Sequence, residues 1–151
     1  MNLFLASPFS QFCEGEEDII IKNRWFFEKI IKELKNLNIE YFCSQEREEW
    51  GLKYVSPEES IKADINGIKK CDLFIAIPGN PISGGVHIEI GWASAFSKKM
   101  ILFLEEDVEY TPMILGLPSI HNCKFIYYKK LISEKTVDLI INTIKEELRC
   151  I

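Results

Sequence analysis

The chain has 151 residues, of which 47% are hydrophobic and 27% charged, and its formal net charge is −5. This length predicts a single domain over residues 1–151 with a sizeable core, and the ordinary composition excludes wholesale disorder. The acidic charge argues against a nucleic-acid partner, because binding to a phosphate backbone needs a basic face. We expect no membrane partner either, since no apolar run approaches the roughly 20 residues that cross a bilayer.

The cysteines and histidines bear on the compartment and on metal binding. The five cysteines form no CxxC pair, and neither of the two histidines lies at a metal-ligand spacing from a cysteine. The simplest interpretation is a cytoplasmic protein with reduced thiols and no metal site. The start, MNLFLASPF, lacks the basic region of a signal peptide, which agrees with this interpretation.

Apolar runs and helical periodicity alternate along the chain. Short apolar runs predict strands at 2–6, 39–43, 73–77, 100–104 and 124–128. Apolar residues at three- and four-residue steps predict helices at about 18–37, at 56–70, from 86 onward and at 133–148. Residues 44–55 are interpreted as an active-site loop, and 107–119 as irregular with one helical turn around 113–115. This alternation predicts an α/β domain with a doubly wound parallel sheet and helices on both faces.

Local signals add detail to these elements. Ser56-Pro57-Glu58-Glu59 is a helix start, with a capping serine, a proline at the first position and two acids at the positive end of the dipole. The residues expected to face the sheet are Ile61, Ile65 and Ile68 on this helix, and Ile90, Ala93 and either Ala95 or Phe96 on the next. The aromatic cluster 25–27 is interpreted as core.

The segment 71–105 is the centre of the functional argument, because it predicts a buried strand, a glycine loop, a helix and a second buried strand. In such sheets ligands bind beyond the carboxyl ends of the strands, against the first turn of the next helix. Glu89 is placed there among apolar neighbours. It is either a pocket carboxylate that acts as nucleophile or general acid/base, or a surface acid that stabilises the helix dipole.

The loop before Glu89 is a candidate anion site. Ser83, Gly84 and Gly85 open the helix, and paired glycines allow a close approach to backbone N–H groups, which can hold a phosphate or carboxylate. Gly79 lies in the same loop. The alternative is a plain tight turn, and the pattern is neither a Walker loop nor GxGxxG.

Other polar residues are candidates with an equally plain alternative. Asp64 could point to the same crevice or to solvent. Arg47 and Trp50 could be lid residues for a phosphate and for the face of a base or sugar, or belong to a solvated loop. His87 is a local hydrogen-bonding group or a catalyst.

Taken together, several motifs resemble a known family. LASPF, an aspartate seven residues before CDLFIAIPG, and the pattern S-G-G-x-x-x-E-I-G-W-A resemble the nucleoside 2-deoxyribosyltransferase superfamily. More narrowly, REEWG, SPEE, the PGNP loop, HIEIGWASA and EEDVEYTPMILGL are similar to its cytidylate N-glycosidase branch. The resemblance covers roughly residues 3 to 117.

The resemblance implies a flavodoxin-like five-stranded fold, an N-glycosidic bond as target and no cofactor. It implies that Glu89 is the nucleophile, that Asp64 positions the sugar and the glutamate, and that Ser83 and Gly85 belong to a phosphate-contacting loop. Phe9 would lie in the loop that packs against the base.

The resemblance also implies an assembly. Tyr110 and Thr111, with Met113 nearby, fall in a segment that reaches a neighbouring subunit's site in relatives. A homodimer or larger homo-oligomer with sites completed across the interface is therefore expected.

One position departs from the branch. A hydroxymethyl-specific relative resembles PFRQ where this chain has Pro8-Phe9-Ser10-Gln11. An arginine beside the base is replaced by Ser10, which favours unmodified CMP or dCMP as substrate. We therefore expect hydrolysis of a pyrimidine nucleoside 5′-monophosphate, and the alternatives are base exchange between deoxynucleosides and a non-catalytic nucleotide sensor.

Overall fold

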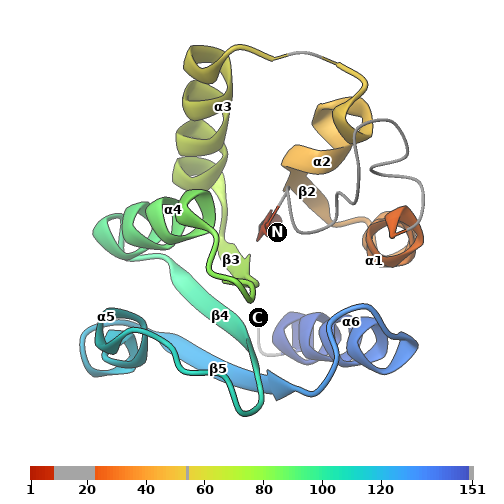
Figure 1. Ribbon diagram of the computed structural model, residues 1–151. Helices are drawn as coiled ribbons and strands as arrows, with labels where there is room; N and C mark the ends of the chain where they lie inside the picture. The colour runs from red at the N-terminus through yellow and green to blue at the C-terminus, as the bar shows by residue number, and fades with distance from the viewer. Residues whose placement is uncertain (9–22, 54, 150–151) are drawn as a thin grey trace.

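The computed structural model describes residues 1–8, 23–53 and 55–149 (Figure 1). Phe9, Ser10 and the predicted helix start at residue 18 lie outside these ranges. The described elements are β1 (Asn2–Ala6), α1 (Arg24–Asn36), β2 (Glu40–Cys43), α2 (Ser44–Arg47), η2 (Glu49–Gly51), α3 (Pro57–Lys70), β3 (Leu73–Ala76), α4 (Gly84–Ala95), β4 (Lys99–Glu105), α5 (Pro112–Leu115), η3 (Leu117–Ser119), β5 (Cys123–Tyr128) and α6 (Glu134–Arg149).

The five strands form one parallel sheet in the order β2-β1-β3-β4-β5. Helices α3, α4 and α5 lie on one side of the sheet, and α1 and α6 on the other (Figure 1). This is the flavodoxin-like strand order, and the predicted doubly wound α/β fold is confirmed.

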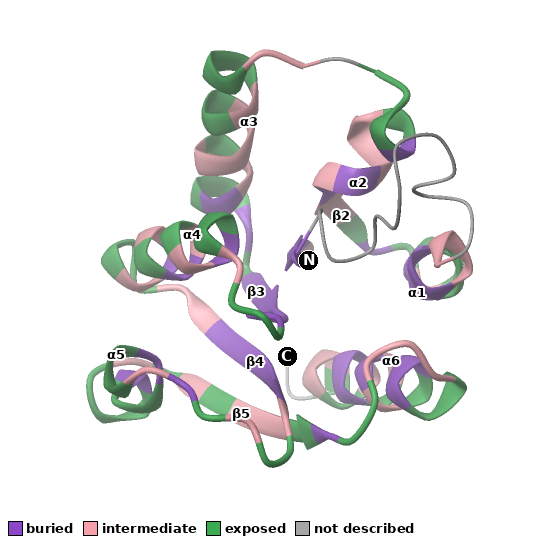
Figure 2. Ribbon diagram, in the orientation of Figure 1, coloured by how far each residue is buried: buried purple, intermediate pink, exposed green. Residues whose placement is uncertain are grey.

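Each face of the sheet has its own apolar layer. One layer joins α1 and α6 to the sheet and includes the fully buried Phe26 and Phe27. The other joins α3, α4 and α5 to the sheet through Ile68, Ile90 and Ile114. Strand β3 is buried along its whole length, in purple at the centre of Figure 2, as its continuous apolar run predicts.

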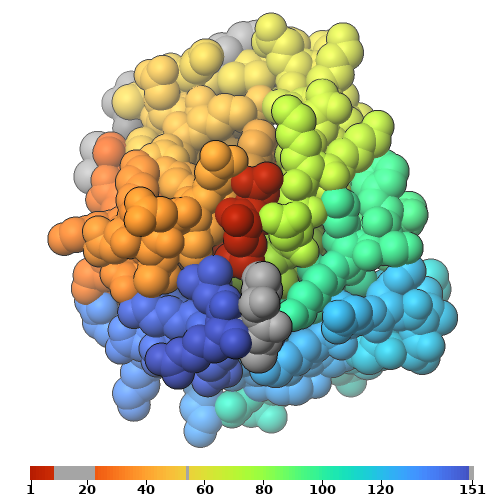
Figure 3. Space-filling model, turned by 180° about the vertical axis from the view of Figure 1, so that it is seen from behind, coloured from red at the N-terminus to blue at the C-terminus, as the bar shows by residue number. Residues whose placement is uncertain are grey.

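The strand order places a switch point between β1 and β3, where the chain leaves the sheet in opposite directions. A ligand crevice forms at the carboxyl ends of such strands. Figure 3 shows the opposite face, on which the N-terminal residues (red) reach the surface beside the residues of β2 and the end of α3. The strands begin on that face, so the candidate site lies on the other one.

Three local predictions are wrong. Residues 44–55 are not a loop, because α2 and η2 occupy most of the segment. Ile61 is 50% exposed, since the first turns of α3 extend beyond the apolar layer, in green and pink in Figure 2. Ala95 and Phe96 are exposed, because the buried stripe of α4 runs through Val86, Ile90 and Ala93 and its next position falls beyond the helix end.

The remaining boundaries agree with the predicted elements to within a few residues. The helical turn expected around 113–115 is α5, and Ser56 with Glu59 forms the capping box that the SPEE segment indicates. None of the described helices combines the length and the apolar composition that crossing a membrane requires.

Candidate active site

The loop after β3 leads directly into α4 and caps it. Ser83 is the N-cap, and its Oγ accepts a hydrogen bond from Val86 N at 3.4 Å. Ser83 N donates to Pro78 O at 3.0 Å, which closes the loop. Gly79 is buried with a φ of 88°, a left-handed conformation that glycine adopts without steric cost. These residues therefore lie together at the carboxyl end of β3.

The paired glycines at the start of α4 are not required by the fold of the described chain. A Cβ on Gly84 would have no neighbour within 4 Å, and one on Gly85 would meet only Ser83 Oγ at 3.9 Å. Neither glycine has a positive φ. Packing and backbone conformation both permit a side chain at the two positions, so the glycines leave the helix N-terminus open to the approach of an anion.

Glu89 lies in the second turn of α4 and is partly buried. Burial, and after it the negative charge of Asp64 on α3, raises the pKa of Glu89 to about 8. The two predicted carboxyl groups therefore come from neighbouring helices and interact electrostatically. At neutral pH the Glu89 carboxyl group is mostly protonated.

Asp64 has partners that favour its ionised form. Burial raises the pKa of Asp64, and the nearby charge of Glu48 acts in the same direction. The hydroxyl of Ser44 opposes this by donating to Asp64 Oδ1 at 3.1 Å, and so does the guanidinium of Arg47, whose Nη2 lies 3.9 Å from Oδ1. The pKa of Asp64 is therefore raised, with burial as the main cause, while Ser44 and Arg47 limit the rise.

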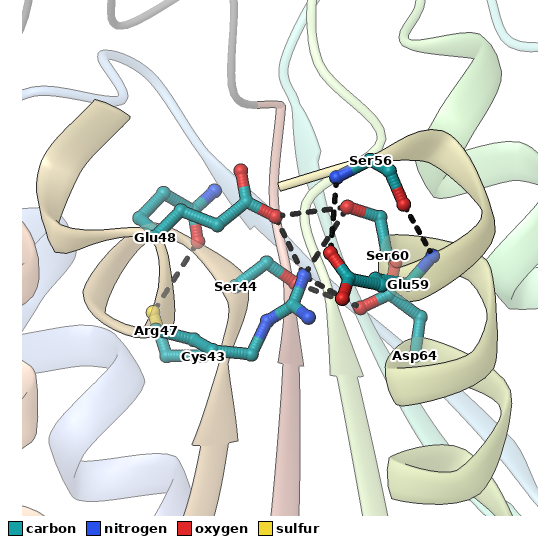
Figure 4. Close-up of polar contacts among 9 residues, drawn as sticks. Cys43, Ser44, Arg47, Glu48, Ser56, Glu59, Ser60 and Asp64 are labelled. Atoms are coloured by element: carbon teal, nitrogen blue, oxygen red, sulfur yellow. Dashed lines mark hydrogen bonds and ion pairs between the residues drawn. The ribbon is translucent and has the colours of Figure 1, made fainter. Parts of the chain in front are cut away.

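These contacts belong to a polar cluster between α2 and α3 (Figure 4). Arg47 Nη2 donates to Glu48 Oε1 at 2.6 Å, and Ser60 Oγ donates to the same oxygen at 3.2 Å. We call Ser44, Arg47, Glu48, Ser60 and Asp64 the α2–α3 polar cluster. Only Arg47 and Asp64 of this cluster were predicted from the sequence, because isolated serines and glutamates in a polar stretch carry no recognisable pattern.

A second polar contact fixes the end of β1. Gln45 is buried, and its Nε2 donates to Ser7 O at 3.0 Å and to Ser7 Oγ at 2.7 Å. Its Oε1 accepts from Cys43 Sγ at 3.3 Å. Gln45 therefore joins the carboxyl ends of β1 and β2 beneath the candidate site, and no sequence pattern indicated it.

Trp50 and His87 have local partners. The Trp50 ring is 9% exposed and packs in the apolar layer with Phe27, while the guanidinium of Arg24 lies 4.9 Å from its centroid. No described contact joins Trp50 to Glu89 or Asp64, so the geometry places this ring in the core rather than over the crevice. His87 Nδ1 donates to Ser83 O at 2.9 Å, in line with a local hydrogen-bonding role.

The remaining predicted residues lie after β4. Tyr110 is buried, and its hydroxyl accepts a hydrogen bond from Glu105 N at 2.7 Å. Thr111 caps α5 by accepting from Met113 N at 3.4 Å, and Met113 is 80% exposed. The described residues do not join this segment to the Glu89–Asp64 pair within the chain. Phe9 and Ser10 lie outside the described residues.

The fold and the site define a class. A flavodoxin-like sheet carries, at its switch point, two interacting carboxyl groups with raised pKa values, and a helix that begins with two glycines and whose N-terminus suits an anion. Within the described residues, no group of three or more His, Cys, Asp or Glu side chains is placed to hold a metal. This arrangement is typical of an enzyme that acts on a small phosphorylated substrate through carboxyl groups.

The comparisons name the family. The model of the nucleoside 2-deoxyribosyltransferase family matches residues 20–143, and the chain belongs to this family. Among solved structures, the CMP N-glycosidase BcmB of Clostridium botulinum is 31% identical, with a TM-score of 0.70 over 97% of this chain and 99% of that one. The solution structure of BlsM is 33% identical, with a TM-score of 0.71 over 98% and 93%.

A more distant match concerns the fold alone. A flavodoxin-like domain from Synechococcus sp. is 12% identical with a TM-score of 0.51, over 93% of this chain and 92% of that one. No curated protein sequence gives a significant match.

Proposed function

We propose that the protein is a nucleotide N-glycosidase that hydrolyses a pyrimidine nucleoside 5′-monophosphate, CMP or dCMP, to the free base and (deoxy)ribose 5-phosphate. The observation that carries the proposal is the Glu89–Asp64 pair beside the open helix start at Ser83–Gly85. Full-length similarity to the CMP N-glycosidase BcmB supports the choice of substrate.

In the proposed first step, ionised Glu89 attacks C1′ of the sugar. The Glu89 oxygen forms a bond to C1′ while the bond from C1′ to the base nitrogen breaks, and the base leaves with the electron pair and takes up a proton. Asp64 stabilises the oxocarbenium-like transition state by its charge and by binding a sugar hydroxyl. This is the logic of retaining glycosidases.

In the second step, water resolves the glycosyl-enzyme. The water oxygen bonds to C1′, the ester bond to Glu89 breaks, and the proton that the water loses balances the one that the base took up. The reaction needs no metal or organic cofactor.

The helix start supplies the binding energy. The amides of Gly84 and Gly85, with Ser83, would hold the 5′-phosphate, which fixes C1′ near Glu89 and makes the attack effectively intramolecular. Phe9 and Ser10 are candidates for the base side. Tyr110, Thr111 and Met113 are candidates for contacts in a homodimer or larger assembly, and a cytoplasmic location remains part of the same prediction.

The test is incubation of the protein with CMP, dCMP, UMP and AMP, with chromatographic detection of the free base. Glu89→Ala should abolish release, and Glu146→Ala, which removes an exposed acid on α6, should keep it. A wild type as inert as Glu89→Ala on all four nucleotides would refute the catalytic proposal.

The second candidate is base exchange, which the family's own name favours. Adding a second free base to the reaction separates the two activities. Transfer would divert the sugar to a new nucleoside and would proceed best on substrates without a phosphate. A non-catalytic sensor would bind nucleotide without turnover and would keep binding in Glu89→Gln.

A further inference from the structure

We infer that Arg47 and Glu48 are positioning residues for this reaction, which together hold the carboxylate of Asp64 at the place where it meets Glu89. The inference rests on the proposed function and goes beyond it, because neither residue needs to touch the substrate. It also assigns a structural role to Arg47 and Glu48, the first two residues of the REEWG segment.

Helix α3 is anchored to the sheet near its C-terminal end. A Cβ on Gly67 would lie 2.9 Å from the Phe4 ring, so α3 packs tightly on β1 at this point, and Ile68 beside it is fully buried. Closer to its N-terminus the helix leaves the core, and Ile61 is exposed (Figure 2). Apolar packing therefore fixes only the C-terminal part of α3.

Asp64 lies where this apolar anchoring ends. Ser60, Asp64 and Ile68 are spaced by four residues and share one face of the helix. That face is apolar at Ile68 and polar at Asp64 and Ser60. The described contacts that join this polar part to the rest of the chain come from α2, as Figure 4 shows.

The α2–α3 polar cluster is held together by Glu48. Glu48 Oε1 accepts from both Arg47 and Ser60, and thereby links α2 to α3. The same contact holds the Arg47 guanidinium 3.9 Å from Asp64 and 5.6 Å from the centroid of the Phe42 ring. The Arg47 charge is thus shared between two carboxylates through Nη2, whereas its buried Nε has no hydrogen-bond partner among the described residues.

A left-handed turn follows directly after Glu48. Glu49, Trp50 and Gly51 all have positive φ, at 49°, 61° and 86°. Such a conformation costs about 1–3 kcal/mol for each non-glycine residue and persists only where the surroundings impose it. Burial of the Trp50 ring in the core supplies that constraint. The turn fixes the end of α2 and therefore the place from which Arg47 and Glu48 reach α3.

The charges around the pair allow a sharp test. Asp64 faces Arg47 and Glu48 from α2 and Glu89 from α4, and in the described chain its own helix adds the neutral Ser60. The charge of Glu89 also contributes, after burial, to the raised pKa of the Cys43 thiol on β2. Arg47 lowers the pKa of Asp64 and Glu48 raises it, so the loss of each charge should move the titration of Asp64 in opposite directions.

The experiment compares Arg47→Gln, Arg47→Lys and Glu48→Gln with the control Arg24→Gln. The control also removes a positive charge, but one that lies over the Trp50 ring rather than beside Asp64. We expect Arg47→Gln to lower kcat about 10- to 100-fold on CMP and cytidine alike, with little change in KM, since a small misplacement costs rate. The titration of the Asp64 carboxyl group, followed by ¹³C NMR, should move to higher pH in Arg47→Gln and to lower pH in Glu48→Gln. Arg47→Lys should restore the wild-type titration, and Arg24→Gln should leave it unchanged.

Two outcomes of these measurements would overturn the positioning role of Arg47 and Glu48. A higher KM for CMP but not for cytidine would make Arg47 a phosphate ligand and overturn the inference, as would Asp64 titrations that move in the same direction in Arg47→Gln and Glu48→Gln. Carboxyl titration of Asp64 by ¹³C NMR needs no turnover. A wild type that releases no base would refute the proposed function. Asp64 pKa shifts of opposite sign in Arg47→Gln and Glu48→Gln would still support the positioning role, and shifts of the same sign would exclude it.

Discussion

The charge of Asp64 on α3 reaches Glu89 on α4, and together with burial it raises the pKa of Glu89 to about 8. The two side chains are 25 positions apart in sequence, and the sheet brings their helices side by side. Glu89 must ionise before it can attack the sugar, and this raised pKa keeps its carboxyl group mostly protonated at neutral pH. The following predictions test consequences of this pair and of the elements that hold it.

The pH profile should report Glu89 directly. If ionised Glu89 is the nucleophile, kcat/KM for base release should rise about tenfold per pH unit up to about pH 8 and then level off. Initial rates on CMP from about pH 5 to about pH 9 measure this. A profile that is flat below neutral pH would show that Glu89 ionises normally and would contradict the assigned pKa.

Replacement of Asp64 by asparagine should lower the pKa of Glu89, because it removes the negative charge that disfavours ionisation while burial remains. The acid limb should move to lower pH, while kcat should fall about 10- to 100-fold, since the sugar and the transition state lose a carboxylate. The same rate measurements on Asp64→Asn show both effects. An unchanged limb would mean that burial alone sets the pKa of Glu89.

Glu89→Gln should stabilise the protein at alkaline pH. The pKa of Glu89 is raised in the folded state, so the stability that this group contributes is fully present below its unfolded pKa of about 4.3 and is lost as pH rises through about 8. Glutamine has no such dependence. Its advantage in the free energy of unfolding should therefore grow by about 1–3 kcal/mol between acidic and alkaline pH, with allowance for partial exposure. Urea unfolding of both proteins at the two ends of this range measures it, and a constant difference would count against the raised pKa.

Gly85→Ala separates folding from binding. The position has room for a Cβ and no positive φ, so alanine should raise helix stability slightly, by up to about 1 kcal/mol. It should nevertheless weaken hydrolysis of CMP, because the methyl group would stand where the phosphate approaches. Thermal unfolding and KM for CMP are the measurements. Gly91→Ala is the matched control, since its Cβ also enters open space farther along α4. Equal effects of the two variants on KM would remove the phosphate site from this loop.

The capping box of α3 should matter for stability. Glu59 N donates to Ser56 Oγ at 3.2 Å, and Ser56 N donates to Glu59 Oε2 at 3.3 Å. Ser56→Ala should lower the free energy of unfolding by about 1 kcal/mol. Urea unfolding measures this, and Ser133→Ala, which removes another serine near a helix start, gives a comparison from the opposite face of the sheet. A Ser56→Ala variant as stable as wild type would show that the first turn of α3 contributes little.

The strands, the main helices and the acidic residue in α4 could be predicted from the sequence. Buried runs such as Leu73–Ala76 and stripes such as that of α6 are local patterns. Glu89 was recognisable because a carboxylate follows a glycine loop within a few residues. The exposure of Ile61 was not predictable, because a helical stripe shows which face is apolar but not where the neighbouring core ends.

The polar contacts around Asp64 were also beyond a local analysis. Arg47 and Trp50 belong to the same short segment, yet one faces α3 and the other faces the core. The chain changes direction at the left-handed turn Glu49–Gly51, which contains Trp50 and follows Arg47. In the sequence, the single glycine is the only residue type that indicates such a turn.

By itself the sequence determined the alternation of strands and helices, the helix start at Ser56 and the candidates Glu89 and Ser83–Gly85, because periodicity, capping and turn chemistry act between residues a few positions apart. Only the tertiary structure decided that Asp64 and Glu89 interact, that Arg47 lies beside Asp64 and Glu48 bonds to Ser60, and that Trp50 is buried in the core. These relationships depend on how far each helix extends past the sheet and on which side chains meet across it, and both follow from packing between segments that are distant in the chain.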